Sequence, residues 1–396
     1  MDSERGAKTE ERLIEGGVVL LALLCWPDLE NPFSTPKTWL LAGLGLTAAA
    51  LAMRRKPAAP WHDGSWPWLA WLAAIAASAA TASRPSFDAL LLVLAPLPLY
   101  WAARRTLISA DRLARAILFA SLLQSVIAVL QYARLDPLRL LGWHPEAFPS
   151  RRMLVYGTLG NPDFVAAWLC ATLPLYAGVV NRKRAVFCGT AVALHLGAIL
   201  ATGSRIFLLT LPVAALVLAL RRHPWTKWCY FGLPVAAALL LFSHTRPLGV
   251  TVQGRLYAAR VTVSHLPHVP VVGYGPGAFQ REFAGWQAEW LPQHPQDGER
   301  RFAGLFDHAH NDYIEFFVEY GPAGLCAFLA LCGWLMARAW RVSDAGVWAA
   351  LASLLAIACV DFPFHRPAEW GLFWLLLASL GSNRATQGGS VTCLHS

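Results

Sequence analysis

Repeated apolar runs constrain this chain more than any other feature. Each is about as long as a helix needs to cross the hydrocarbon core of a bilayer, some with help from tilt or local thinning. The runs lie at residues 13–27, 38–53, 66–83, 86–103, 113–132, 162–180, 184–202, 205–220, 228–243, 322–337, 344–361 and 369–382. Only 14% of the 396 residues are charged and 56% are hydrophobic, too few charges to cover a water-facing surface. We therefore expect an all-α membrane protein with about twelve transmembrane helices.

The loops between these runs alternate in basic charge. Clusters of two to four cations follow every second run, as in Arg54-Arg55-Lys56 and Arg182-Lys183-Arg184. The intervening short loops carry one cation each: Lys37, Arg84, Arg205 and Arg366. Positive charge marks the cytoplasmic side of membrane proteins, so this pattern predicts that both termini are cytoplasmic. It also accounts for the net charge of +9 without a nucleic-acid partner.

Two long connections interrupt the pattern, and this topology places both outside. The predicted organisation is transmembrane helices 1–5 in 1–132, an outer loop in 133–161, helices 6–9 in 162–243, a large periplasmic loop in 244–321, helices 10–12 in 322–382, and a cytoplasmic tail in 383–396. The loop 244–321 is too long for a simple connector, so we expect it to form a small subdomain.

The ionisable residues favour chemistry at the outer face. Eight of the twelve histidines fall in the segments placed outside: 144, 244, 265, 268, 294, 308, 310 and 365. A pump or proton-coupled carrier places acids or histidines near the membrane midplane, where only His195 is a candidate. A core histidine bonded to a neighbouring helix is the simpler interpretation of His195. The eight cysteines form no CxxC pair, which argues against a zinc site or a disulfide framework.

Three outer motifs precede the most informative one. Residues 157–164 read GTLGNPDF and resemble an ordinary helix start, with Asp163 in the first turn. The turn 202–205 reads TGSR, and Arg205 there has the alternative role of an interfacial anchor. Arg255 precedes the segment 273–279, GYGPGAF, whose glycines, Gly275 among them, would let backbone N–H groups approach an anion.

The fourth motif, DHAHNDYIEFFVEYGPAG at 307–324, is the most informative. If 310–320 is helical, Asn311, Glu315 and Glu319 form one polar stripe that must face water, a cavity or a ligand. Gly321-Pro322 should break the helix there, with Pro322 beginning the next span. A metal on His308 and His310, flanked by Asp307 and Asp312, is the less favoured alternative, because no HExxH or comparable spacing is present.

These motifs resemble those of a known family. His310-Asn311, then Gly321-x-x-Gly324, is similar to the signature of the bacterial O-antigen ligases and the related O-antigen polymerases and protein O-oligosaccharyltransferases. The preceding motifs, and DFPFHRP at 361–367, agree in order and spacing over roughly residues 150–370. Asp163 departs from the pattern, because a second Asn is more usual there, and we expect this position to be peripheral to the chemistry.

The resemblance implies a GT-C-like membrane glycosyltransferase of the O-antigen ligase type, working on the periplasmic side of the bacterial inner membrane in lipopolysaccharide assembly. It implies a preassembled glycan on undecaprenyl diphosphate as donor, a lipid-linked sugar as acceptor, inversion at the anomeric carbon, and no metal or other cofactor. Alternatives with the same donor are a polymerase of O-antigen or exopolysaccharide and a protein O-oligosaccharyltransferase. Alternatives of another class are a transporter of lipid-linked glycans and a non-catalytic scaffold.

Transfer from a polyprenyl diphosphate requires a base for the acceptor hydroxyl and positive charge for the leaving diphosphate. We predict that His310 is the base, since an imidazole is largely neutral near pH 7 yet accepts a proton readily; positioning of the acceptor is the alternative role. Arg205 and Arg255 should hold the diphosphate with bidentate hydrogen bonds, in place of Mg²⁺. Supporting roles, in orienting the imidazole or the acceptor or in completing the same face, are predicted for Asn311, Asp312, Glu315, Glu319, Gly275, Asp361, His365 and Arg366.

Overall fold

The computed structural model describes residues 2–54, 66–106, 108–144, 151–179, 185–221, 250–295, 299–340 and 344–380. Its helices, in chain order, are α1 (Asp2–Leu23), α2 (Thr35–Met53), α3 (Trp66–Thr81), α4 (Phe87–Leu94), α5 (Pro96–Thr106), α6 (Ala110–Tyr132), α7 (Pro162–Thr172), α8 (Tyr176–Val179), α9 (Ala185–Thr202), α10 (Phe207–Leu220), α12 (Val250–His265), α13 (Phe279–Gln293), α14 (Asp312–Ala339), α15 (Ala345–Ile357) and α16 (Pro367–Ser379). Short 3₁₀ turns complete the described part, which contains no strand.

Eleven of the twelve apolar runs coincide with described helices, and the run 228–243 lies outside the described residues. Four helical stretches are long and apolar enough to cross a membrane: Phe87–Thr106, Ala110–Tyr132, Pro162–Val179 and Asp312–Ala337. Shorter apolar helices cover Val186–Thr202, Phe207–Leu220 and Ala345–Ile357. The all-helical membrane class is therefore confirmed, while the count of twelve crossings stays a prediction.

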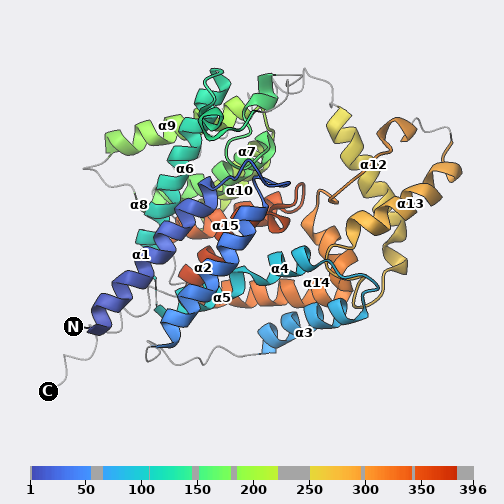
Figure 1. The fold of residues 1–396 in the computed structure, drawn as a ribbon, viewed down its shortest axis with the longest axis horizontal. Helices are drawn as coiled ribbons and strands as arrows, with labels where there is room; N and C mark the ends of the chain where they lie inside the picture. Colours follow the sequence, from blue (N-terminus) through green and yellow to red (C-terminus); the bar gives the residue numbers. More distant parts are fainter. Residues whose placement is uncertain are drawn as a thin grey trace.

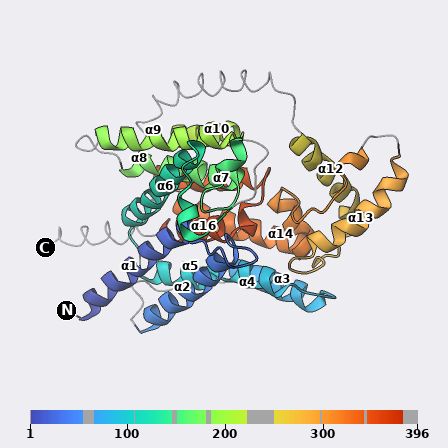
Figure 2. The ribbon, with the colours of Figure 1, turned by 45° about the horizontal axis from the view of Figure 1, so that its top comes forward.

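The helices pack into one bundle with a projecting arm. In the bundle α2 lies against α5, α3 against α14, α6 against α1 and α9, and α10 against α15. Figures 1 and 2 show α12 and α13 standing to one side of this bundle, away from the start of α1. The arm has a small core of its own, which includes Tyr257, Phe279, Phe283 and Trp286. The described part of the arm is thus a small packed unit.

Side-chain caps fix where the helices that carry the site begin. Asn161 accepts a hydrogen bond from Asp163 N at the start of α7, and Pro162 occupies the first helical position. Asn311 accepts from Tyr313 N and Ile314 N at the start of α14. These polar caps end the preceding loops at defined positions and so orient the first turn of each helix.

Helix α14 is broken at the residue that the sequence indicated. Gly321 has φ 69° and ψ 177°, so Asp312–Tyr320 and the apolar part that begins at Pro322 are two helical segments joined at a kink. The carbonyl groups freed by the kink find partners in other segments: Tyr274 N donates to Val318 O, while Gly275 N and Ser78 Oγ donate to Glu319 O. The kink is therefore the junction of α3, α14 and the arm.

Candidate active site

The loops at one end of the bundle converge on two histidine clusters. The first, here called the His310 cluster, comprises Asp163, Arg255, His310, Asp361 and Arg366. The second, the His365 cluster, comprises His308, Asp312, Glu315, Glu319 and His365. The ring of Phe362 lies between them, stacked on His308 at 4.1 Å between centroids and edge-on to His310 at 5.2 Å.

In the His310 cluster, Asp361 is the central anion. Its side chain is fully buried, Arg366 Nη1 donates to Oδ2 at 2.9 Å, and His310 Nδ1 lies 3.6 Å from Oδ1. Burial alone would raise the pKa of this carboxyl, but the Arg366 charge, the adjacent His310 imidazole and the Arg255 charge lower it well below its usual range. Asp361 is therefore a permanent anion facing one ring nitrogen of His310.

Arg366 is held in turn by three other groups. Its Nε lies 3.1 Å from Glu369 Oε1, and its guanidinium carbon lies 4.2 Å from the ring centroid of Phe164 and 5.3 Å from that of Phe362. These contacts immobilise the cation that fixes Asp361. Arg366 therefore stabilises the position and the charge of Asp361.

Arg255 reaches the same cluster from α12. Its Nη2 lies 3.3 Å from Asp163 Oδ2, and Nη1 donates to Val360 O at 3.2 Å. Its Nε is buried without a hydrogen-bond partner among the described residues. Asp163, which we expected to be peripheral to the chemistry, contacts Arg255 and so helps to fix its orientation. No local signal in the sequence linked these two residues, which are 92 positions apart.

Arg205 lies outside the His310 cluster. It lies in the turn between α9 and α10, which Thr202 and Ser204 stabilise through hydrogen bonds to backbone N–H groups. Its side chain is exposed, and no hydrogen bond or ion pair joins it to another described residue. The structure thus brings Arg255 and His310 together around Asp361 and leaves Arg205 pointing to solvent.

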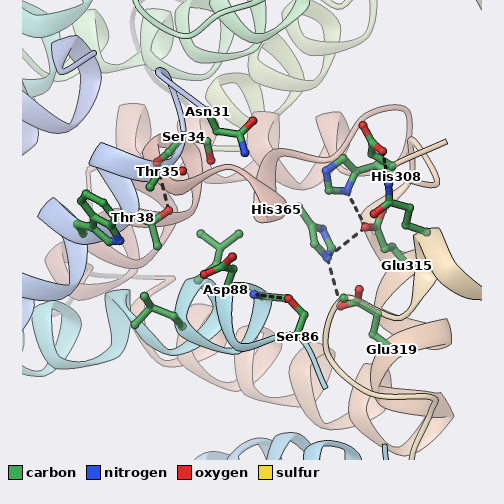
Figure 3. Close-up of a pocket in the computed structure, with 17 residues that line it drawn as sticks. Asn31, Ser34, Thr35, Thr38, Ser86, Asp88, His308, Glu315, Glu319 and His365 are labelled. Carbon is green, nitrogen blue, oxygen red and sulfur yellow. Dashed lines mark hydrogen bonds and ion pairs between the residues drawn. The ribbon is translucent and has the colours of Figure 1, made fainter. Parts of the chain in front are cut away.

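The polar stripe on α14 forms the His365 cluster. His365 Nδ1 lies 2.6 Å from Asp312 Oδ1, and its Nε2 lies 3.5 Å from both Glu315 Oε1 and Glu319 Oε2. His308 Nδ1 lies 2.7 Å from Glu315 Oε1, and Ala309 N donates to Glu315 Oε2. Figure 3 shows the His365 ring directed between Glu315 and Glu319.

The three carboxylates of this cluster are buried in a region with few cations. Asp312 is 0% exposed, while Glu315 and Glu319 are each 1% exposed. Burial would lower the pKa of His365, but Glu315 and hydrogen bonds to Asp312 and Glu319 raise it well above its usual value. The stripe therefore faces a cavity wall and an imidazole instead of open water.

Asn311 and Gly275 have structural contacts. Asn311 caps α14 and donates through Nδ2 to Cys359 O at 2.9 Å, which ties the helix start to the loop after α15. The N–H of Gly275 donates to Glu319 O at 2.9 Å and so docks the arm on α14. The predicted contact of that N–H with an anion has no support in this geometry.

The residues that the sequence offered as alternative metal ligands do not converge on one point in the structure. Asp307 accepts a hydrogen bond from Gln280, His310 faces Asp361, and Asp312 faces His365. His195 is a core histidine, as the simpler interpretation had it: Nε2 lies 2.8 Å from Leu169 O and the residue is fully buried. It takes no part in either cluster.

Two cavities adjoin the clusters. The first, of about 270 Å³, is lined mainly by hydroxyl, amide, imidazole and carboxylate groups, including Ser34, Thr38, Asp88, Gln280 and Glu319 (Figure 3). The second, of about 460 Å³, is lined by Lys37, Phe164, Phe362, Arg366 and other residues. Asn31, Ser34, Asp307, His308 and His365 line both. The second cavity therefore touches both clusters.

The sequence analysis gave Lys37 no role beyond topology. The structure buries its ammonium, which donates to the carbonyl oxygens of Leu24 and Thr158. Lys37 thereby joins the corner between α1 and α2 to the loop before α7 and forms part of the cavity wall.

Comparison with known proteins identifies the central third of the chain. Residues 190–329 match the family model described as O-antigen ligase. This segment is similar to the O-antigen ligase family. The matched segment contains Arg205, Arg255 and His310, whereas Asp163, Asp361, His365 and Arg366 lie outside it. No curated protein sequence matches the chain.

The similarity of this segment to the O-antigen ligase family supports a membrane enzyme that transfers lipid-linked glycans. The acids and bases gathered at one end of a bundle of apolar helices agree with that class. The described structure places His310 and Arg255, both within the matched segment, close enough to Asp361 for both to lower its pKa.

Proposed function

We propose that this protein is an inner-membrane glycosyltransferase that moves a preassembled glycan from undecaprenyl diphosphate to a lipid-linked acceptor at the periplasmic face. The observation that carries the proposal is the convergence of His310 and Arg255 on the buried anion Asp361, beside a cavity of about 460 Å³. Two residues that line this cavity reach the cluster: Arg366 donates to Asp361, and the ring of Phe362 contacts His310. A base and a cation close together are the two groups that this transfer needs.

His310 is the proposed base. The acceptor hydroxyl oxygen forms a bond to the anomeric carbon while the bond from that carbon to the diphosphate oxygen breaks, and the hydroxyl proton passes to the imidazole. Because Nδ1 faces Asp361 at 3.6 Å, Nε2 is the ring nitrogen left to accept the proton. The carboxylate then stabilises the imidazolium that forms. A single displacement of this kind inverts the anomeric centre.

Arg255 is the proposed group for the leaving diphosphate. Its unpartnered Nε and the outward side of its guanidinium supply donors to phosphate oxygens, while Asp163 and Val360 O hold its orientation. Arg205 joins from the α9–α10 turn when the donor is bound. These permanent cations do the work of an exchangeable Mg²⁺ in balancing the charge of the diphosphate.

The cavities suit sugars. The second cavity reaches Phe362 and Arg366, which contact the His310 cluster, and we assign the reacting sugar to it. The first cavity presents the acceptors and donors that sugar hydroxyls bind, and we assign it to the adjoining sugar units. The aromatic ring of Phe362 supplies an apolar face at the boundary.

The proposal is tested by reconstituted transfer. Purified protein in liposomes, with an undecaprenyl-diphosphate glycan and a lipid-linked acceptor, should form product in the presence of EDTA. His310→Ala should abolish transfer, and Arg255→Lys should lower the rate about a hundredfold or more because a point charge cannot reproduce the fork. The exposed residues His268 and Arg260, changed to Ala and Lys, are matched controls.

Each outcome has a definite meaning. Full activity of a folded His310→Ala variant would refute the proposed base. Loss of activity in EDTA, restored by Mg²⁺, would show that a metal, and not Arg255, carries the diphosphate charge. Product size on several acceptors separates the variants of the reaction: one transfer per acceptor indicates a ligase, and a ladder indicates a polymerase.

A further inference from the structure

The His365 cluster contains more donor atoms than the proposed transfer uses. Four of its side chains, His308, Glu315, Glu319 and His365, meet at the wall of the first cavity. One ligand atom each from His308, Glu315 and His365 lies within 4.8 Å of the others. Phe362 separates this group from His310, so a function distinct from proton transfer has to explain it.

We propose that this cluster is a binding site for one divalent transition-metal ion, with Zn²⁺ the preferred ion. The ligands are His365 Nε2, one oxygen each from Glu315 and Glu319, and the imidazole of His308. Two imidazoles and two carboxylates form a mixed nitrogen and oxygen set of the type that Zn²⁺ binds.

The distances fit a shared ion better than direct hydrogen bonds. Both carboxylates lie 3.5 Å from His365 Nε2, at the outer limit for a hydrogen bond. Donor atoms bound to one Zn²⁺ at about 2.1 Å are separated by roughly 3–3.6 Å. His308 lies closer, at 2.7 Å from Glu315 Oε1, and joins the ion by exchanging that hydrogen bond for coordination.

Charge balance points the same way. Asp312, Glu315 and Glu319 are buried side by side, and their neighbours in the cluster are two imidazoles, which together supply at most two positive charges for three carboxylates. Isolated buried carboxylates are costly, so such groups are paired or coordinate a metal. A divalent ion placed among them supplies two positive charges. Arg366 does not supply this charge, because it already forms ion pairs with Asp361 and Glu369.

The contact between His365 and Asp312 would orient the imidazole toward a bound metal ion. His365 Nδ1 lies 2.6 Å from Asp312 Oδ1, and Asp312 Oδ2 accepts from Phe364 N at 2.8 Å. A carboxylate that accepts from one ring nitrogen fixes the tautomer and directs the lone pair of the other nitrogen to the metal. Figure 3 shows Nε2 of His365 facing Glu315 and Glu319. The ion would thus fix the position of the loop residue His308, two residues before the proposed base.

Metal content tests this site without any substrate. Protein purified in detergent is dialysed against a chelator, incubated with Zn²⁺, Mn²⁺ or Mg²⁺, desalted, and measured by elemental analysis and thermal unfolding. We expect about one Zn²⁺ per chain and a higher Tm with Zn²⁺ than after chelation. His365→Asn and the near-isosteric Glu319→Gln should each remove stoichiometric binding, and Asp312→Asn should weaken it about 10- to 100-fold.

The controls separate this site from adventitious metal and from the transfer reaction. His268→Ala and His310→Ala should retain the wild-type metal content. Binding of less than a tenth of an equivalent of Zn²⁺ or Mn²⁺ to folded wild-type protein, with no change in Tm, would overturn the site. So would equal metal content in His365→Asn. Because the readout needs no donor or acceptor, failure here leaves the proposed transfer standing, and failure of the transfer leaves the metal site standing.

Discussion

Replacing Asp361 with Asn tests whether the carboxylate acts through His310. The side chain is fully buried, accepts from Arg366 at 2.9 Å, and faces His310 Nδ1 at 3.6 Å. Asn keeps the volume and one acceptor oxygen but removes the charge that holds Nδ1 and stabilises the imidazolium. Loss of a partner that orients a functional imidazole costs about 10- to 100-fold, and loss of the Asp of a catalytic triad costs about 10⁴-fold in kcat. Because 3.6 Å is longer than a hydrogen bond, we expect a loss of 10- to 100-fold in kcat.

The same substitution should destabilise the protein. Breaking a buried ion pair costs about 3–5 kcal/mol, and we expect the lower end because Glu369 still lies 3.1 Å from Arg366 Nε. The lowered pKa of Asp361 fixes the sign of the pH dependence. The carboxyl is ionised in both the folded and the unfolded state above about pH 5. Its contribution to stability is therefore constant from pH 5 to 8, and is lost only at lower pH, as it becomes protonated in the folded state.

Initial transfer rates per folded molecule, together with Tm at several pH values, measure both effects. Glu369→Gln is the matched control, because Glu369 contacts Arg366 without contacting His310. It should lower Tm and leave the rate per folded molecule close to wild type. A folded Asp361→Asn variant with wild-type kcat would refute the role of Asp361. So would an equal loss of kcat in both variants, because the effect would then come from Arg366.

Three further substitutions test other parts of the structure. Gly273→Ala should strongly lower or abolish the stability of the fold, because a Cβ there would lie 2.2 Å from the backbone oxygen of Glu319. Gly285→Ala on α13 is the control, because its Cβ would meet nothing within 4 Å and should be tolerated. Thermal unfolding compares the two variants, and equal Tm values would contradict the docking contact. Asn311→Ala should lower the free energy of unfolding by about 1 kcal/mol through loss of the α14 cap. Denaturant unfolding measures this loss, with a substitution of the exposed Asn31 by Ala as the control. An unchanged midpoint would show that the cap is dispensable. Arg205→Lys should strongly lower kcat/KM for the donor, and a near-normal value would assign Arg205 to anchoring at the membrane surface.

The local features of the fold could be predicted from the sequence. The apolar runs located the helices, the motif 157–164 marked a helix start, and Gly321-Pro322 marked the kink in α14. These predictions succeeded because each depends on residues that are neighbours along the chain. The start of α1 at Asp2, well before the apolar run at 13–27, shows the limit, since a helix can extend through polar residues that hydropathy does not count.

The pairings within the site could not be predicted. The motif 361–367 reads as one segment, yet Asp361 faces His310 and His365 faces Asp312, so its residues divide between two clusters. The pairs His310–Asp361 and Asp163–Arg255 join residues 51 and 92 positions apart, and periodicity carries no information on such contacts. The glycines of 273–279 illustrate the same limit: their conformational freedom was evident, but their partner was the kink of α14 and not an anion.

The hydrogen bonds at the kink couple the arm of α12 and α13 to the helix bundle. Helix α3 and the arm both attach to the last carbonyl groups before Gly321, within one helical turn of Glu319. Any change in the tilt of the arm must therefore shift the floor of the first cavity. Substitutions along α13 that do not touch these hydrogen bonds would leave the hinge intact. Substitutions at the root of the arm, around Tyr274 and Gly275, would alter the cavity itself.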